Sequence, residues 1–183
     1  SENVGYLRGE TCQSIFLDFS RVYKTSRQAL PIGLSQHGLV YRNEISPRNG
    51  LLREREFEQL ETELFFDPDK INETPISLDK ISSYKIRLKL LSDTKEKDYK
   101  ISSIIKRKLT YGNLITYALY ITQTFLEELG FSRELIRFRE VGESDRAFYS
   151  KQTFDCEVFS ENVWIELFCV NYRTDYDLLA HSR

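Results

Sequence analysis

The sequence is poor in the residues from which many recognisable sites are built. Its 183 residues include three cysteines, two histidines and no methionine. Cys12, Cys156 and Cys169 are odd in number and far apart, so they indicate neither a disulfide framework nor a zinc site. Two histidines argue against His-rich metal chemistry. We expect buried free thiols in a reducing compartment, the cytoplasm.

The sequence also lacks a long apolar run and an excess of one charge. No run approaches the ~20 apolar residues that cross a membrane, and no signal peptide is present, so we expect no membrane partner. Its 26 basic and 28 acidic residues give a net charge of −2, which argues against bulk binding of nucleic acid but not against a local site. The length fits one domain, or one domain with an insertion. A first residue that is serine predicts a processed chain or an excised piece.

The N-terminal part combines helical and strand patterns. We expect a helix within residues 1–30 and a strand at 39–44. Residues 46–50 read Ser-Pro-Arg-Asn-Gly, which is typical of a turn. The stretch 54–66 is ambiguous: its composition favours a helix, whereas a strand would place Phe57, Gln59 and Glu61 on one face. The apolar side of the first helix is expected to contain Ile15, Phe16, Phe19 and Val22.

The C-terminal part begins with the clearest helix, 113–129, with Asn113 as its N-cap and Gly130 closing it. Residues 154–158 alternate like a half-buried strand, and 163–170 are apolar on both faces, which predicts a central strand. Helices and strands do not alternate regularly, so the predicted class is α+β. The apolar face of the helix is expected to contain Leu114, Ala118, Ile121, Phe125 and Leu129.

The segment 67–110 is the most polar, and we expect it to be a lightly packed insertion between core parts 1–66 and 111–183. Its Lys106-Arg107-Lys108 cluster indicates a solvated face or, less commonly, an RNA contact.

Glu166 is the only charge in the run VWIELFCV. A buried carboxylate is costly unless it is paired, so this one is expected to have a partner. It either faces solvent at the edge of a sheet, pairs with a structural arginine, or serves as a metal or substrate ligand. The loop that follows contains Arg173, Asp175 and Asp177, and loops at strand ends are where sites collect.

Charge is dense in the stretch RNEISPRNGLLREREF, residues 42–57. Arg42 and Glu44 would share a strand face, and Phe57 and Glu61 would share the face of a returning strand. An arginine, an aromatic ring and carboxylates together suit a nucleotide. A surface hairpin with mixed charges explains the same pattern.

Four blocks resemble one family in its usual order. YRNEISPRNGLLREREF closely resembles motif 2 of class II aminoacyl-tRNA synthetases, and more narrowly that of glycyl-tRNA synthetases of the dimeric archaeal and eukaryotic type. YLRGETCQSIFLDF, LIRFREVGESDRAFYS and VWIELFCVNYRTDYDLLAHSR resemble further segments of these enzymes. Only about 67–110 is weakly matched.

The resemblance implies an α+β catalytic core with an antiparallel sheet flanked by helices, incomplete in this chain, in which 54–66 is a strand. It implies that glycine is activated with ATP and transferred to the 3′ end of tRNA(Gly), with Mg²⁺ as cofactor. The motif 1 and motif 3 segments are not found, so we expect a catalytic-core fragment of a homodimeric enzyme. A non-catalytic synthetase-like binding or dimerisation module is the alternative.

The resemblance assigns residues to the nucleotide site. Arg42 is expected to hold the α-phosphate, with Glu44 near the adenine and the tRNA end, and these two are the expected catalytic residues. Arg53 is expected to contact the ATP phosphates, and Phe57 to stack on the adenine. Glu166 is expected to bind magnesium together with those phosphates.

The same resemblance places Glu10, Glu61 and Arg173 in the glycine pocket, where the carboxylates suit the ammonium and the arginine suits the carboxylate. Arg48 is expected to follow the tRNA acceptor end. Cys169 stands where the family usually has glycine, and its side chain would crowd the pocket.

Overall fold

The computed structural model describes residues 4–46 and 53–181, and the chain divides into two compact units. The first unit contains residues 1–67 and 178–183, and the second contains residues 68–177. Each unit has a hydrophobic core of its own.

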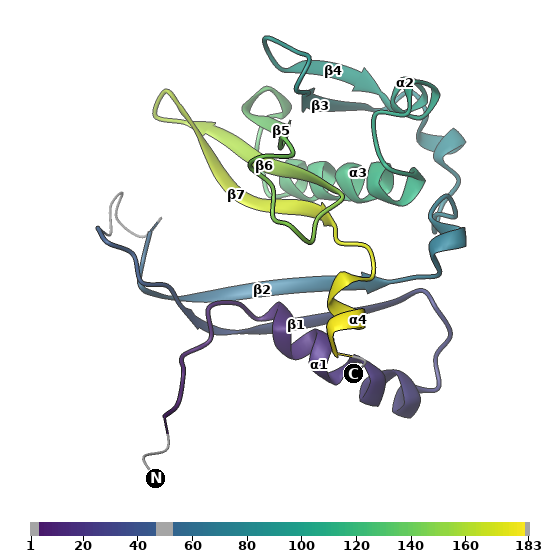
Figure 1. Cartoon of the computed structure of the whole chain (residues 1–183). Coiled ribbons are helices and arrows are strands. Elements are labelled where there is room, and N and C mark those ends of the chain that lie inside the picture. The colour runs from purple at the N-terminus through teal and green to yellow at the C-terminus, as the bar shows by residue number, and fades with distance from the viewer. Residues whose placement is uncertain (1–3, 47–52, 182–183) are drawn as a thin grey trace. The chain divides into compact units, whose positions relative to one another are not determined.

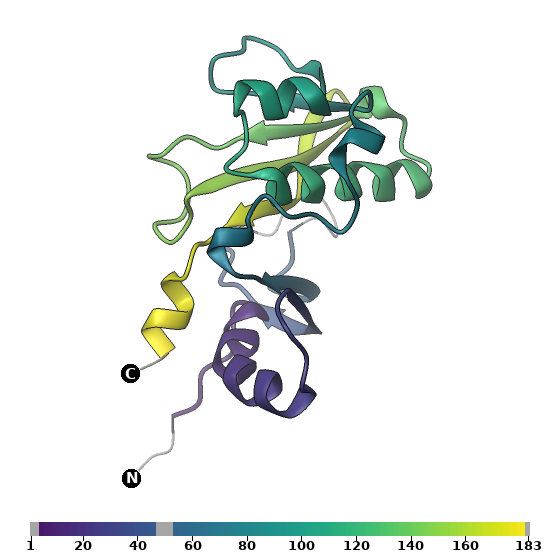
Figure 2. The same ribbon diagram turned by 90° about the vertical axis from the view of Figure 1, so that its right-hand side faces the viewer.

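The first unit is a long β-hairpin with one helix packed on it. Strands β1 (Ile32–Tyr41) and β2 (Glu56–Phe65) pair antiparallel over their whole length. Helix α1 (Cys12–Ser26) contacts both strands, as Figure 2 shows with the hairpin seen nearly end-on. The buried core consists of Cys12, Ile15, Phe16, Ile32 and Phe65, with Phe19, Leu34 and Leu178 packed against it.

Strand β2 resolves the ambiguity of residues 54–66. Its exposure alternates strictly, with Phe57, Gln59 and Glu61 on the less exposed face that ends at the buried Phe65. The predicted strand is therefore confirmed, together with its facing. Pairing with β1 and burial against α1 outweigh the helical propensity of the sequence.

The strand expected at 39–44 is wrong at its C-terminal end. Strand β1 starts earlier, at Ile32, and ends at Tyr41. Beyond it the Glu44 N–H donates to the Arg42 carbonyl at 2.9 Å, which turns the chain. Arg42 and Glu44 therefore do not share a strand face. Most of the turn predicted at 46–50 lies outside the described residues.

The second unit is built on a five-stranded sheet in the order β4-β3-β5-β6-β7 (Figure 1). All neighbouring strands are antiparallel except β3 and β5, which are parallel. Helix α3 contacts three of the strands, β3, β5 and β7. The strands are β3 (Lys85–Lys89), β4 (Lys97–Lys100), β5 (Ile136–Glu140), β6 (Gln152–Ser160) and β7 (Val163–Tyr172). The helices are α2 (Ile101–Arg107) and α3 (Asn113–Glu128), with 3₁₀ turns at Pro68–Lys70, Leu78–Ile81 and Arg133–Leu135. Helix α4 (Tyr176–His181) begins in this unit and ends in the first.

The segment 67–110 is well packed, so the expectation of light packing is wrong. It supplies two strands and a helix to this unit, and Ile86, Leu88, Ile101 and Ile104 are fully buried in its core. In β3 the buried apolar side chains alternate with charged ones, which lowers the mean hydropathy of the segment without weakening the core. The division at 66 and 110 stays a prediction.

Helix α3 is confirmed, and Gly130 closes it with a φ of +98°. Of the expected apolar face, however, only Leu114 is buried. Ile121, Phe125 and Leu129 are 44%, 52% and 60% exposed. Gly112, and not Asn113, is the N-cap. The buried side chains are Leu114, Ile115, Thr116, Leu119, Gln123 and Leu126.

Both C-terminal strands are confirmed, but their expected environments are reversed. Strand β6 lies between β5 and β7, and its residues from Thr153 to Val158 are all buried. Strand β7 is the last strand of the described sheet, and Val163, Leu167 and Phe168 on it are exposed. The sequence did not predict this burial because β6 contains Asp155 and Glu157, whose charges are paired with arginines of the neighbouring strand β5.

Candidate functional site

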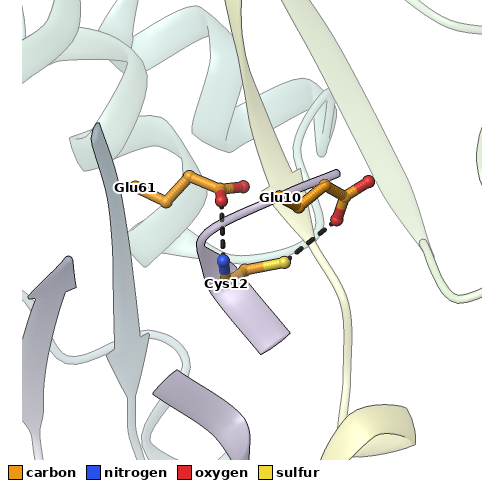
Figure 3. Close-up of side chains that lie close together, drawn as sticks. All are labelled: Glu10, Cys12 and Glu61. Atoms are coloured by element: carbon orange, nitrogen blue, oxygen red, sulfur yellow. Dashed lines mark hydrogen bonds between the residues drawn. The ribbon is translucent and has the colours of Figure 1, made fainter. Parts of the chain in front are cut away.

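Glu61 is held at the N-terminus of helix α1. Its Oε2 accepts a hydrogen bond from the Cys12 N–H at 2.7 Å (Figure 3). It also accepts from the Thr11 N–H at 2.8 Å and from the Thr11 hydroxyl at 2.6 Å. The first N–H groups of a helix have no partner within it and carry positive partial charge, so a carboxylate is stabilised there. The strand β2 thus fixes the position of Glu61, and α1 fixes the orientation of its carboxylate.

Glu10 lies beside this carboxylate. The Cys12 thiol donates to Glu10 Oε2 at 3.1 Å, and ligand atoms of Glu10, Cys12 and Glu61 lie within 4.8 Å of one another (Figure 3). These atom types are able to bind a metal ion. The thiol is engaged as a donor and Glu61 already accepts three bonds, so hydrogen bonding accounts for the cluster. Two carboxylates this close suit a ligand with an ammonium group.

Four of the residues expected at the nucleotide, Arg42, Glu44, Arg53 and Phe57, lie at the end of the hairpin where the loop joins β1 to β2. The Arg42 guanidinium is 5.2 Å from the centre of the Phe57 ring. An Arg53 nitrogen is 3.9 Å from a carboxylate oxygen of Glu44, and the Glu44 carbonyl accepts a bond from Arg55 at 3.0 Å. An open hollow here is lined by Leu7, Tyr41, Arg42, Asn43, Arg55 and Glu56. The expected Arg48 lies outside the described residues.

Glu166 lies exposed on β7, the last strand of the described sheet, which agrees with the edge-facing alternative and not with a buried carboxylate. It is opposite Glu157 in the β6–β7 pairing. Burial and the charge of Glu166 raise the pKa of Asp155 to about 6, although Arg139 acts in the opposite direction. Glu166 therefore lies exposed near Asp155, a second carboxyl group whose pKa it raises.

Two arginines of β5 neutralise the acids of β6. The Arg137 Nε donates to Glu157 at 2.6 Å, and the Arg139 Nε donates to the same carboxylate at 2.8 Å. Arg139 also pairs with Asp155. The Arg137 guanidinium lies 4.1 Å from the centre of the Trp164 ring. This paired array surrounds Glu166 with fixed charges and leaves its carboxylate exposed.

Arg173 is held by its own unit. It donates two hydrogen bonds of 2.8 Å to the two carboxylate oxygens of Asp177, and its guanidinium lies 3.8 Å from the centre of the Tyr149 ring. A bidentate pair and a stacked ring fix the plane of the guanidinium. Asp177, which the sequence placed near this site, is thus the residue that orients Arg173.

Sequence reasoning missed several residues at these sites. Thr11 and Gln59 bond at the start of α1, with the Thr11 N–H also donating to Gln59 at 3.2 Å. Only the three-dimensional pairing of α1 with β2 reveals them. Asp155 and Glu157 lie two apart in a strand, a spacing that places both carboxylates on one face.

The thiols differ in exposure. Cys12 and Cys156 are buried and form no disulfide, as expected, whereas Cys169 is exposed, against expectation. It lies opposite Asp155 in the β6–β7 pairing. Burial raises the pKa of the Cys156 thiol to about 12, so this thiol is not a nucleophile near neutral pH.

Among the described residues, no helix is both long enough and apolar enough to cross a membrane.

Comparison with known proteins identifies the relatives of the chain. It is 38% identical over 182 residues to a glycine–tRNA ligase of Pyrococcus horikoshii, covering 97% of this chain and 32% of that protein. A glycine–tRNA ligase of Methanothermobacter thermautotrophicus is 35% identical over 187 residues, covering 100% and 33%. One from Aeropyrum pernix is 38% identical over 187 residues, covering 99% and 32%. The chain thus spans about a third of the length of the curated relatives it matches.

The family profile described as tRNA synthetase class II core domain (G, H, P, S and T) matches residues 2–180. The match covers both units, the hairpin with its arginines and the α1 terminus with its two glutamates. The chain therefore belongs to the class II tRNA synthetase core domain family.

Proposed function

We propose that the chain carries the glycine-activating and ATP-binding sites of a glycine–tRNA ligase. The observation that carries the proposal is the pair Glu10 and Glu61, which are held together at the N-terminus of α1 in a chain whose relatives are named glycine–tRNA ligases. The reaction forms glycyl-adenylate from glycine and ATP, with release of pyrophosphate, and then transfers the glycyl group to the 3′ end of tRNA(Gly).

In this proposal Glu10 and Glu61 receive the ammonium group of glycine, and Arg173 receives its carboxylate. Glycine offers no side chain to bind, so selectivity depends on excluding larger amino acids. Rigid groups serve that purpose. Glu61 is fixed by three hydrogen bonds and Arg173 by two, so neither side chain gives way easily to an extra methyl group.

ATP would be bound by the hairpin. Arg42 would hold the α-phosphate as charge develops on it, and Arg53 would contact the phosphates. Phe57 would stack on the adenine, and Glu44 would lie near the adenine and the tRNA end. Such chemistry depends on positioning and on charge stabilisation. The present cation–π contact of Arg42 with Phe57 keeps the cation and the ring adjacent before ATP binds.

Mg²⁺ would accompany the ATP phosphates. The exposed carboxylate of Glu166 fits this role because Mg²⁺ prefers oxygen ligands and commonly takes only one or two protein carboxylates besides phosphates and water. The ion would neutralise phosphate charge. Arg48 would follow the tRNA acceptor end, and the whole protein would be a cytoplasmic homodimer.

The proposal is tested by calorimetric titration with a non-hydrolysable glycyl-adenylate analogue and its alanyl counterpart. We expect selective binding of the glycyl analogue, weakened at least about tenfold in Glu61→Gln because the charge partner of the ammonium is lost. The matched control is Glu58→Gln, a change on the opposite, exposed face of β2. Binding that is equal for both analogues, or unaffected by Glu61→Gln, would contradict the proposal and favour the non-catalytic module.

A further inference from the structure

Positive charge is concentrated in one part of the second unit. Residues 85–108, which form β3, β4 and α2 and are here called the basic segment, contain nine lysines and arginines but only three acids. The chain as a whole has a net charge of −2. The remainder is therefore clearly acidic, and the average hides a strongly basic region.

The three acids of the basic segment are engaged within the unit. Asp93 is buried, pairs with Lys97 at 2.5 Å and accepts a hydrogen bond from the Tyr99 hydroxyl at 2.6 Å. Glu96 pairs with Arg87 and Arg137, and Asp98 pairs with Arg87 at 3.3 Å. These acids offset the half-buried Arg87 and one surface lysine, and leave the rest of the surface positive.

Seven cations of the basic segment are exposed. Lys97 is paired with Asp93. The Arg107 guanidinium lies 5.4 Å from the centre of the Tyr99 ring, so the side chain at the end of α2 contacts β4. Figure 1 shows β3 and β4 side by side at one end of this unit, with α2 next to the end of the pair. No described acid forms an ion pair with the other five, which are Lys85, Lys95, Lys100, Lys106 and Lys108.

Lys85 and Lys100 lie directly opposite each other in the β3–β4 pair. Like charges at opposite positions of an antiparallel pair are destabilising. Lysines on an edge strand prevent edge-to-edge association, and cations at the end of a helix suit its dipole. Those roles explain Lys97 and Lys106, but they do not require two lysines face to face. A polyanion that lies across both would remove their repulsion.

We infer that the basic segment binds the phosphate backbone of RNA, and that this RNA is the tRNA substrate. The choice of tRNA rests on the proposed function. Exposed lysines that neutralise phosphates release counterions, which is the main source of affinity in such contacts. The strand β4 extends about 13 Å, at about 3.3 Å per residue, and the helix α2 about 10 Å, at about 1.5 Å per residue, so the two elements together present cations to more than one phosphate.

The test measures the binding of a fluorescent tRNA(Gly) transcript by anisotropy between about 50 and 200 mM salt. The variant is the pair Lys85→Gln and Lys100→Gln. Two lost phosphate contacts should make the slope of log K against log salt less negative by about 1.5 and weaken binding roughly tenfold or more. The matched control is Lys24→Gln with Lys70→Gln, two exposed lysines outside the basic segment, which should leave slope and affinity unchanged.

Removing the facing lysines should not lower the melting temperature, so lost binding cannot be ascribed to unfolding. An unchanged salt slope overturns the inference. So does tighter binding to phosphatidylserine vesicles than to tRNA, which would make the partner a membrane surface. The glycyl-adenylate analogue should bind the Lys85→Gln, Lys100→Gln variant normally. If the analogue binds no form of the protein while the salt slope still responds, the glycine proposal fails and the RNA surface stands.

Discussion

Glu61 shows how one side chain serves both the fold and the proposed site. Its Oε2 satisfies N–H groups of Thr11 and Cys12 that no residue within α1 reaches, so the helix start depends on it. The same bonds fix the carboxylate next to Glu10. From the sequence, resemblance named Glu61, but nothing in its neighbourhood in the chain points to Thr11, which lies 50 residues away. The spacing of apolar residues along the chain cannot reveal contacts between residues that are so far apart in the sequence.

Asp155 provides a residue-scale prediction. Its pKa is raised to about 6 by burial first and by the charge of Glu166 second. Between about pH 4 and 6 the folded state therefore binds more protons than the unfolded state, so this group lowers the free energy of unfolding as the pH rises. Glu166→Gln removes the repulsion, and the pKa of Asp155 should move toward 3.8. Carboxyl chemical shifts in an NMR titration would measure it.

The same titration of Glu128→Gln, an exposed glutamate at the end of α3, serves as the control and should leave the pKa of Asp155 unchanged. Denaturant unfolding gives a second measure: the loss of stability between about pH 4 and 6.5 should be smaller in Glu166→Gln than in the native protein. An unaltered Asp155 titration in Glu166→Gln would show that Glu166 does not act on this carboxyl group.

At the scale of elements, the sequence predicted which helices and strands exist better than it predicted how deeply they are buried. All the expected strands and the helix at 113–129 are present, because apolar spacing and punctuating glycines are local signals. The burial of β6 was underestimated, because Asp155 and Glu157 are neutralised by Arg139 and Arg137 from another strand. The burial of β7 was overestimated, because apolar residues alone do not show where a strand lies in a sheet.

Helix α3 allows a direct test of which face is buried. Leu119 is fully buried, whereas Ile121 is 44% exposed. Leu119→Ala should lower the free energy of unfolding by about 2–5 kcal/mol, because it leaves a cavity in the core of the second unit. Ile121→Ala should cost under about 1 kcal/mol. Urea unfolding of both variants compares them.

Equal losses for Leu119→Ala and Ile121→Ala would contradict this assignment, as would a larger loss at Ile121. Gln123, one of two polar residues on the buried face, explains why spacing alone chose positions that are mostly exposed. Its amide donates to the Lys85 carbonyl at 2.9 Å and accepts from the Arg87 N–H at 3.0 Å, so a polar residue is buried and apolar ones are not.

At the scale of the whole molecule, average properties concealed the distribution of charge. A net charge of −2 argued against a bulk interaction with nucleic acid, yet the basic segment is strongly positive. The class II resemblance is confirmed over residues 2–180, and the chain spans about a third of its glycine–tRNA ligase relatives. The roles of Arg42, Glu44, Arg53, Phe57 and Glu166 remain predictions, because each concerns a ligand.

The most direct test of the account is amino-acid-dependent exchange of pyrophosphate into ATP by the protein, with glycine and with alanine. Exchange with glycine should exceed that with alanine at least about tenfold, since a single methyl group must be excluded. Arg42→Ala should lower the glycine rate roughly a hundredfold with an unchanged melting temperature, because the residue is exposed and acts on developing charge. No exchange with glycine, equal exchange with alanine, or a parallel loss of folding in Arg42→Ala would contradict the account.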